Sequence, residues 1–303
     1  MRQRGLTTRP GQALACALVL AAGSLTGVAA RAQIFKANPT SAPPVTAARS
    51  AASAPGASGT PGNPLLRRLV DTATPMDSAQ EAALGREMVL TVLTDHALVN
   101  DISLQTYVNE LGRWISLEST QPDLPWTFGV LDSSSVAAYA APGGHVFITR
   151  GLLDRMGTEA ELASLLAHEI AYVTDRHVLK ALARQATANP RATLPALVRE
   201  LYAQGLDADS QFAADRSAVM LATRTGFNPH ALANAIKLAS PRGAETTVLS
   251  ALLGPDAMTR QRLSQLKQFM GTRFDGVGPK SSPRIGERLA QLNLPLEKPS
   301  LWP

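Results

Sequence analysis

Residues 165–177 read LLAHEIAYVTDRH, an apolar stretch interrupted by a few polar side chains. Its apolar residues recur at helical spacing, which predicts a largely buried helix. His168 and Tyr172 are four residues apart, so they lie on one face of that helix, one turn from each other. Glu169 follows His168 directly. A histidine and a glutamate inside an apolar helix indicate a candidate functional site.

His168, Glu169 and Tyr172 follow the order of the motif H-E-x-x-H, with tyrosine in place of the second histidine. In the intact motif, two histidines one turn apart hold a zinc ion, and the glutamate acts as general base on the zinc-bound water. This chain keeps the first histidine and the glutamate. Two alternatives therefore stand: an enzyme that uses other metal ligands, and a protein that has lost its metal.

Residues 1–32 have the pattern of a secretory signal peptide. Arginines precede an apolar run at 13–30, and a small-x-small sequence predicts cleavage after Ala32. A retained membrane anchor is the alternative, which the glycine and hydroxyl residues in the run disfavour. The only cysteine, Cys16, would leave with the signal peptide. A metal site in the mature chain must then use His, Asp or Glu.

The formal net charge of the chain is +5 at pH 7. Four arginines and no acidic residue lie in residues 1–32, so the charge falls from +5 to +1 when these residues are removed. A nearly neutral chain gives no argument for nucleic acid or anionic lipid as a partner. We therefore expect no nucleic-acid binding.

Residues 33–64 are dominated by Ala, Pro and Ser, a composition that cannot bury enough apolar surface to fold and predicts a disordered linker. Residues 65–303 then form one domain. Helical periodicity dominates it, so we expect an α+β fold, mainly helical with a small β-sheet. Thr158 and Glu161 predict a capping box at the start of a helix that runs through His168 to about Gln185.

Four stretches share their motifs with one family. The family's N-terminal helices are similar to residues 80–112, and its motif N-A-F-A-x-P-G-G is similar to AAYAAPGG at 137–144. Its motif A-H-E-I-A-H-V-x-x-R-H is similar to residues 167–177. Its motifs E-[FY]-x-A-D and G-[YF]-D-P are similar to QFAAD and GFNP, which both lie within 211–229. The chain thus resembles the zinc metallopeptidases of the HtpX and CAAX prenyl protease type (gluzincins), and among them the secreted, periplasmic BepA-like branch. This resemblance covers roughly residues 75–292 and implies a zincin-like metallopeptidase fold.

The resemblance places the three zinc ligands of the family at His168, Tyr172 and Gln211, and its general base at Glu169. Two of these ligand positions are therefore substituted. Asp215 matches the carboxylate that orients a ligand histidine. A neutral amide is a weak zinc ligand, and a phenol must lose a proton with a pKa of about 10 to serve as one. We expect zinc, the cofactor of the family, to be bound weakly or not at all, and the phenol, amide and imidazole to hydrogen-bond to one another.

The family also binds extended chains along an edge strand beside its cleft, and this mode of recognition needs no metal. In this sequence we expect that edge strand at residues 145–149. Its substrate-binding residues would be His145, Val146, Phe147 and Ile148.

Three functional hypotheses follow. The first is a secreted pseudo-peptidase of the cell envelope that binds envelope or outer-membrane proteins in quality control or assembly, or that regulates an active relative of the family. The second is an active zinc-dependent metalloendopeptidase of periplasmic protein quality control, with ligands recruited from Glu169, Asp215 or His177. The third is a structural or lipid-associated protein. The first two imply export across the inner membrane to the periplasm, with association to the outer membrane as a further option.

Overall fold

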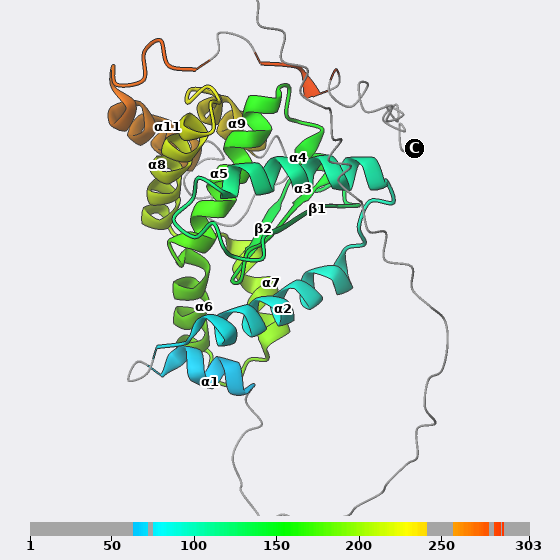
Figure 1. Ribbon diagram of the computed structural model, residues 1–303. Coiled ribbons are helices and arrows are strands. Elements are labelled where there is room, and N and C mark those ends of the chain that lie inside the picture. The colour runs from blue at the N-terminus through cyan, green and yellow to red at the C-terminus, as the bar shows by residue number, and fades with distance from the viewer. Residues whose placement is uncertain (1–62, 72–74, 241–256, 279–281, 286, 288–303) are drawn as a thin grey trace, which may run out of the picture. The chain divides into compact units, whose positions relative to one another are not determined.

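The computed structural model describes residues 63–71, 75–240, 257–278, 282–285 and 287 (Figure 1). The predicted signal peptide at 1–32 and all but the end of the predicted linker at 33–64 lie outside these residues. The described part begins with three helices, α1 (Pro64–Val70), α2 (Ser78–Asp95) and α3 (Ile102–Ser116).

A small mixed sheet follows the three helices. It contains β1 (Thr127–Leu131), β2 (Ala138–Ala141) and β3 (His145–Thr149) in the order β1-β3-β2. β3 pairs in parallel with β1 and antiparallel with β2. Gly143 and Gly144 form the turn between β2 and β3 with φ values of 83° and 93°, a region that glycine adopts without the cost of a Cβ atom.

The predicted edge strand at His145–Thr149 is wrong, because β3 lies in the middle of the sheet. The glycine turn folds β2 onto one side of β3, and β1 occupies the other side. Val146, Phe147 and Ile148 are consequently buried, and His145 is half-buried. The edge strands are β1 and β2. Sequence alone shows that β2 and β3 form a hairpin, but the pairing of β1 depends on contacts distant in the chain.

α5 (Glu159–Thr174) is the central helix of the described domain, and all of its residues except Tyr172 and Thr174 are buried. It begins with the predicted capping box, in which the Thr158 hydroxyl accepts from the Glu161 N–H and the Glu161 carboxylate accepts from the Thr158 N–H. α3, β2, α8 (Ala208–Arg224) and α9 (Ala231–Ala239) all pack against α5 (Figure 1). The polar residues of α5 are therefore held in the protein interior.

The single helix predicted from 158 to about 185 is broken. α5 ends at Thr174, and α6 (His177–Ala188) begins after Arg176, which has a left-handed backbone with φ 57°. This conformation costs a non-glycine residue roughly 1–2 kcal/mol. The Arg176 guanidinium lies 2.8 Å from the carboxylate of Glu81, and this ion pair helps to hold the bend. Because neither glycine nor proline marks the break, local sequence did not reveal it.

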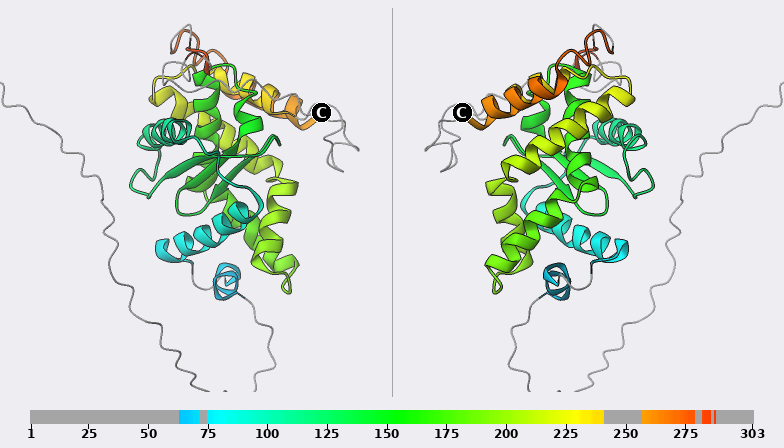
Figure 2. Two further views of the ribbon diagram at one scale, coloured as in Figure 1. Left: turned by 90° about the vertical axis from the view of Figure 1, so that its right-hand side faces the viewer. Right: turned by 90° about the vertical axis from the view of Figure 1, so that its left-hand side faces the viewer.

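The remaining described helices are α4 (Arg150–Leu153), α7 (Leu194–Gln204) and α11 (Ala257–Met270). Segments far apart in the sequence lie side by side, with α1 against α6, α2 against α7, and α11 against α8 and α9 (Figure 2). The predicted fold class, a mainly helical α+β domain with a small sheet, is confirmed. Among the described helices, none combines the length and the apolar character that a membrane crossing requires.

Candidate functional site

A cavity of about 240 Å³ lies beside α5. Its walls come from β2 and from α4, α5, α6, α7, α8, α9 and α11, and most of them are apolar. The apolar wall includes Leu165, Val178, Leu201, Leu206, Leu232 and Ile236. Polar side chains gather on the wall that α5, α8 and α11 form; they are His168, Glu169, Tyr172, Gln211 and Arg262. The cavity therefore combines a large apolar surface with a compact polar group.

α5 brings His168, Glu169 and Tyr172 to this cavity together. The side chains of His168 and Glu169 are buried, with residue exposures of 4% and 5%. The Tyr172 ring packs edge-on against the His168 ring, with centroids 4.4 Å apart. The Tyr172 ring also approaches the ring of His177, with centroids 6.1 Å apart. His177, one of the three alternative ligands considered from the sequence, begins α6 directly after the break and lies beside this ring.

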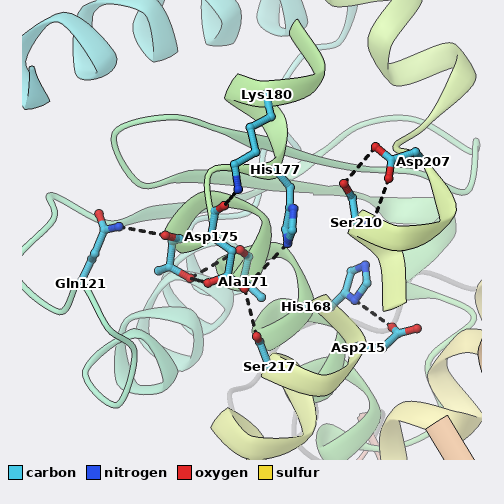
Figure 3. Close-up of polar contacts among 11 residues, drawn as sticks. Gln121, His168, Ala171, Asp175, His177, Lys180, Asp207, Ser210, Asp215 and Ser217 are labelled. Carbon is cyan, nitrogen blue, oxygen red and sulfur yellow. Dashed lines mark hydrogen bonds and ion pairs between the residues drawn. The ribbon is translucent and has the colours of Figure 1, made fainter. Parts of the chain in front are cut away.

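Asp215 on α8 lies against both His168 and Arg262. Its Oδ1 is 3.0 Å from His168 Nδ1, within ion-pair distance (Figure 3). Arg262 donates from Nε to Oδ2 over 2.9 Å and from Nη2 to Oδ1 over 2.6 Å. This is the bidentate geometry of a strong charge-assisted pair. The structure thus brings Asp215 to His168, and it adds an arginine that no sequence motif had connected with the site.

The charges of this group follow from burial and pairing. Burial raises the pKa of Asp215, but the hydrogen bonds from Arg262 and the contact with His168 outweigh burial and hold that pKa well below its usual range. Burial lowers the pKa of Arg262, and its bonds to Asp215 more than restore it. Burial also lowers the pKa of His168 by more than Asp215 raises it. At neutral pH, an ionised Asp215 and a charged Arg262 therefore flank a neutral His168.

Glu169 and Tyr172 are neutral at the same pH. Burial raises the pKa of Glu169 to about 8, although the nearby Arg262 opposes this shift. No described residue forms a hydrogen bond with the Glu169 carboxyl group that would stabilise its charged form. Burial also raises the pKa of the Tyr172 phenol.

Gln211 lines the cavity, and its amide nitrogen is engaged by the backbone. Its Nε2 donates to the Leu206 carbonyl over 2.7 Å, a short local bond to the segment that precedes α8. The predicted hydrogen bonds among Tyr172, Gln211 and His168 are wrong in the described structure. Tyr172 meets His168 by ring packing, and a backbone carbonyl within easy reach engages the amide of Gln211.

These side chains do not fit a zinc ion. Zinc sites use at least three strong N, S or O⁻ ligands from the protein, and here a buried neutral phenol and an engaged amide hold two of the three positions. Within the described ranges, no three His, Cys, Asp or Glu side chains come together as a metal site. Arg262 also lines this cavity and binds both oxygens of Asp215, so that this carboxylate is already engaged.

β2 forms a further wall of the cavity through Ala138 and Ala140. Thr149 N donates to the Ala137 carbonyl over 3.0 Å, so the alternation of an antiparallel ladder turns the backbone groups of Ala138 and Ala140 away from β3. The Tyr202 hydroxyl from α7 donates to the Ala140 carbonyl over 2.8 Å. The strand edge beside the cavity therefore belongs to β2, and Tyr202 engages one of its backbone groups.

Comparison with known proteins relates this site to a family. Residues 102–198 match the family model of Peptidase family M48. The chain is 30% identical over 175 residues to the beta-barrel assembly-enhancing protease of Escherichia coli (strain K12), a match that covers 50% of this chain and 36% of the relative. It is 34% identical over 122 residues to the putative beta-barrel assembly-enhancing protease of Vibrio cholerae, covering 40% and 25%.

A more distant match is the mitochondrial metalloendopeptidase OMA1 of Schizosaccharomyces pombe, 35% identical over 77 residues, which are 25% of this chain and 23% of that protein. The chain spans about a quarter to a third of the length of the assembly-enhancing proteases that it matches. The family match includes α5 with His168, Glu169 and Tyr172. Motifs, fold and similarity agree: residues 102–198 are similar to Peptidase family M48, and the chain is similar over part of its length to the beta-barrel assembly-enhancing proteases.

Proposed function

We propose that this chain is a pseudo-peptidase of the cell envelope that binds envelope or outer-membrane proteins during their assembly or quality control without cleaving them. The observation that carries this proposal is the set of side chains at the family's ligand positions. His168 is accompanied there by a buried phenol and by an amide bonded to backbone. The similarity to proteases named for β-barrel assembly supports the class of client.

The proposed binding mode uses β2 and the apolar cavity together. An extended client segment would add to the free edge of β2 and bond to the backbone of Ala138. One of its apolar side chains would then enter the cavity, whose aliphatic walls suit such a group. The proposal also includes export across the inner membrane, with residues 1–32 as a cleaved signal peptide and 33–64 as a linker to the binding domain.

The second candidate is an active zinc-dependent metalloendopeptidase of the periplasm. The specific observation in its favour is that His168 and Glu169 remain side by side in the cavity, with Asp215 against the histidine. The metalloendopeptidase hypothesis requires further ligands for the zinc ion. Asp215 is held by both nitrogens of the Arg262 fork, which weighs against its recruitment.

Metal content separates the two candidates. The mature protein, purified without a histidine tag, is measured by elemental analysis after dialysis against trace zinc. We expect far less than about one zinc per chain, because a single neutral histidine cannot supply the three ligands that a zinc site requires. A variant with Tyr172→Ala serves as the control for adventitious surface zinc. If wild type instead holds about one zinc per chain, and His168→Ala loses it, the protein is a zinc-binding metallopeptidase.

Client binding along β2 can be tested by site-specific photo-cross-linking. We expect a photoreactive residue at Ala138 to cross-link to an unfolded outer-membrane β-barrel protein, because Ala138 lies on the free edge and lines the cavity. The matched control is the same residue at Val146, which is buried in the central strand. Equal cross-linking from positions 138 and 146 would contradict client binding along β2. So would the absence of cross-linking from position 138 in a variant that is shown to be folded.

A further inference from the structure

Tyr202 of α7 lies across the edge of β2 that the proposed client would use. Its hydroxyl group donates to the Ala140 carbonyl over 2.8 Å, and its ring packs edge-on against the ring of Tyr139, with centroids 4.9 Å apart. Tyr202 also lines the cavity, as Ala138 and Ala140 do. Because successive side chains of a strand point to opposite faces of the sheet, Tyr139 lies on the face away from the cavity. Tyr202 therefore contacts β2 from both faces and closes the edge between them.

The exposure of β2 agrees with this position of Tyr202. Ala140 is buried, with 2% exposed, whereas Ala138, two residues earlier on the same face, is only half-buried. The backbone groups of both alanines point away from β3, as the antiparallel ladder requires. The Ala140 carbonyl already accepts from a phenol, but among the residues that the structure describes none bonds to the outward groups of Ala138. The part of β2 that is open for pairing is therefore Ala138.

An extended segment can use the N–H and the C=O of Ala138 through a single residue. In a hydrogen-bonded antiparallel pair, two opposite residues exchange both N–H···O bonds and point their side chains to the same face. A client residue opposite Ala138 therefore directs its side chain into the cavity. The client residue two positions earlier then lies opposite Ala140, where its N–H would meet the carbonyl that Tyr202 occupies.

We propose that Tyr202 sets the specificity of client binding: it ends the pairing at Ala140 and selects extended segments that carry proline two positions before the residue that enters the cavity. Any other residue at that position brings an N–H without a partner, and burial of an unpaired donor is unfavourable. Proline has no N–H and is compatible with an extended strand at a sheet edge. This inference rests on the proposed client binding along β2, and it names the class of segment that binds.

Three labelled peptides test this preference with the mature protein. Each is a short peptide of serine and threonine with one central leucine for the cavity, and its Kd is measured by fluorescence anisotropy. The first carries proline two residues before the leucine, and the second carries alanine there. The third carries alanine there and proline two residues after the leucine. We expect the first to bind at least about fivefold more tightly than the second, which corresponds to about 1 kcal/mol for an unpaired N–H. The third should show no gain over the second.

Tyr202→Leu should abolish the preference for proline. Leucine retains an apolar side chain but has no hydroxyl group and is too short to cross the edge, so the Ala140 carbonyl becomes free. The alanine peptide should then bind at least as tightly as the proline peptide. The matched control is Tyr107→Leu, because Tyr107 is also half-buried and donates to Glu159 over 3.1 Å, but it does not line the cavity. The preference for proline should be unchanged in this control.

The outcomes separate the role of Tyr202 from client binding itself. Equal affinity for the first two peptides in wild type, or a preference that persists in folded Tyr202→Leu, would overturn the role of Tyr202 while client binding stands. A gain from proline after the leucine would overturn the antiparallel pairing. Binding of no peptide to folded wild type would contradict both this inference and the proposed binding mode. If Tyr202→Leu does not fold, Tyr202→Phe replaces it: it also frees the Ala140 carbonyl, and an unchanged preference would overturn the proposal.

Discussion

Arg262→Met in the wild-type background should lower the free energy of unfolding by about 3–5 kcal/mol at pH 7. The reason is that the substitution leaves the ionised Asp215, with a side chain 2% exposed, without its bidentate partner. Asp215→Leu should be destabilising to a similar degree, because it leaves the guanidinium uncompensated. Urea denaturation followed by circular dichroism measures both changes.

The double variant Asp215→Leu with Arg262→Met should be more stable than either single variant. Replacement of both partners by apolar side chains removes the buried charges together, and such replacements are often nearly neutral. The matched control is Arg199→Met, because Arg199 forms the same kind of fork with Asp95 while 52% of its side chain is exposed. Loss of the exposed Arg199–Asp95 ion pair should lower the free energy of unfolding by about 0–1 kcal/mol. Strictly additive single effects at Asp215 and Arg262 would contradict this account.

The contribution of the Asp215–Arg262 pair also depends on pH in a defined direction. Because pairing holds the pKa of Asp215 below the ordinary aspartate value of 3.8, the native state binds fewer protons there than the unfolded chain. The stabilisation is therefore present above pH 3.8 and is lost as the pH falls below it. In Asp215→Leu this acid-dependent loss should be absent.

Glu169→Gln should make the protein more stable than wild type, and increasingly so as the pH rises from 4.5 to 8. Burial raises the pKa of Glu169 from the ordinary 4.5 to about 8. Between these values the native state holds a proton that the unfolded chain releases, so the free energy of unfolding of wild type falls by about 1.4 kcal/mol per pH unit. The loss reaches at most about 5 kcal/mol and is complete above pH 8.

Glutamine stays neutral throughout this range and occupies nearly the same volume, so it avoids the loss. Urea denaturation at half-unit pH steps from 4.5 to 8.5 measures the difference between Glu169→Gln and wild type. Glu110→Gln on α3, an exposed position, serves as the matched control. The same pH dependence in wild type and Glu169→Gln would show that the native carboxyl group is not held in its protonated form.

Local patterns in the sequence predicted much of this protein. The spacing in residues 165–177 predicted the buried helix and placed His168 and Tyr172 on one face, because side chains four residues apart in a helix lie one turn from each other. The Thr158 capping box and the glycine turn at 143–144 were equally readable, since each depends on only a few neighbouring residues. The family resemblance and the loss of two ligand types also follow from the sequence.

What local patterns did not reveal depends on contacts between distant segments. The bend at Arg176 is helped by Glu81, far earlier in the chain, and β3 is central only because β1 joins it from another segment. The ligand substitutions were evident from the sequence, whereas the cation beside them was not. The sequence of one helix does not predict that Arg262 of α11 pairs with Asp215 of α8. The two side chains come together only when the helices pack, and burial then makes an unpaired carboxylate energetically costly.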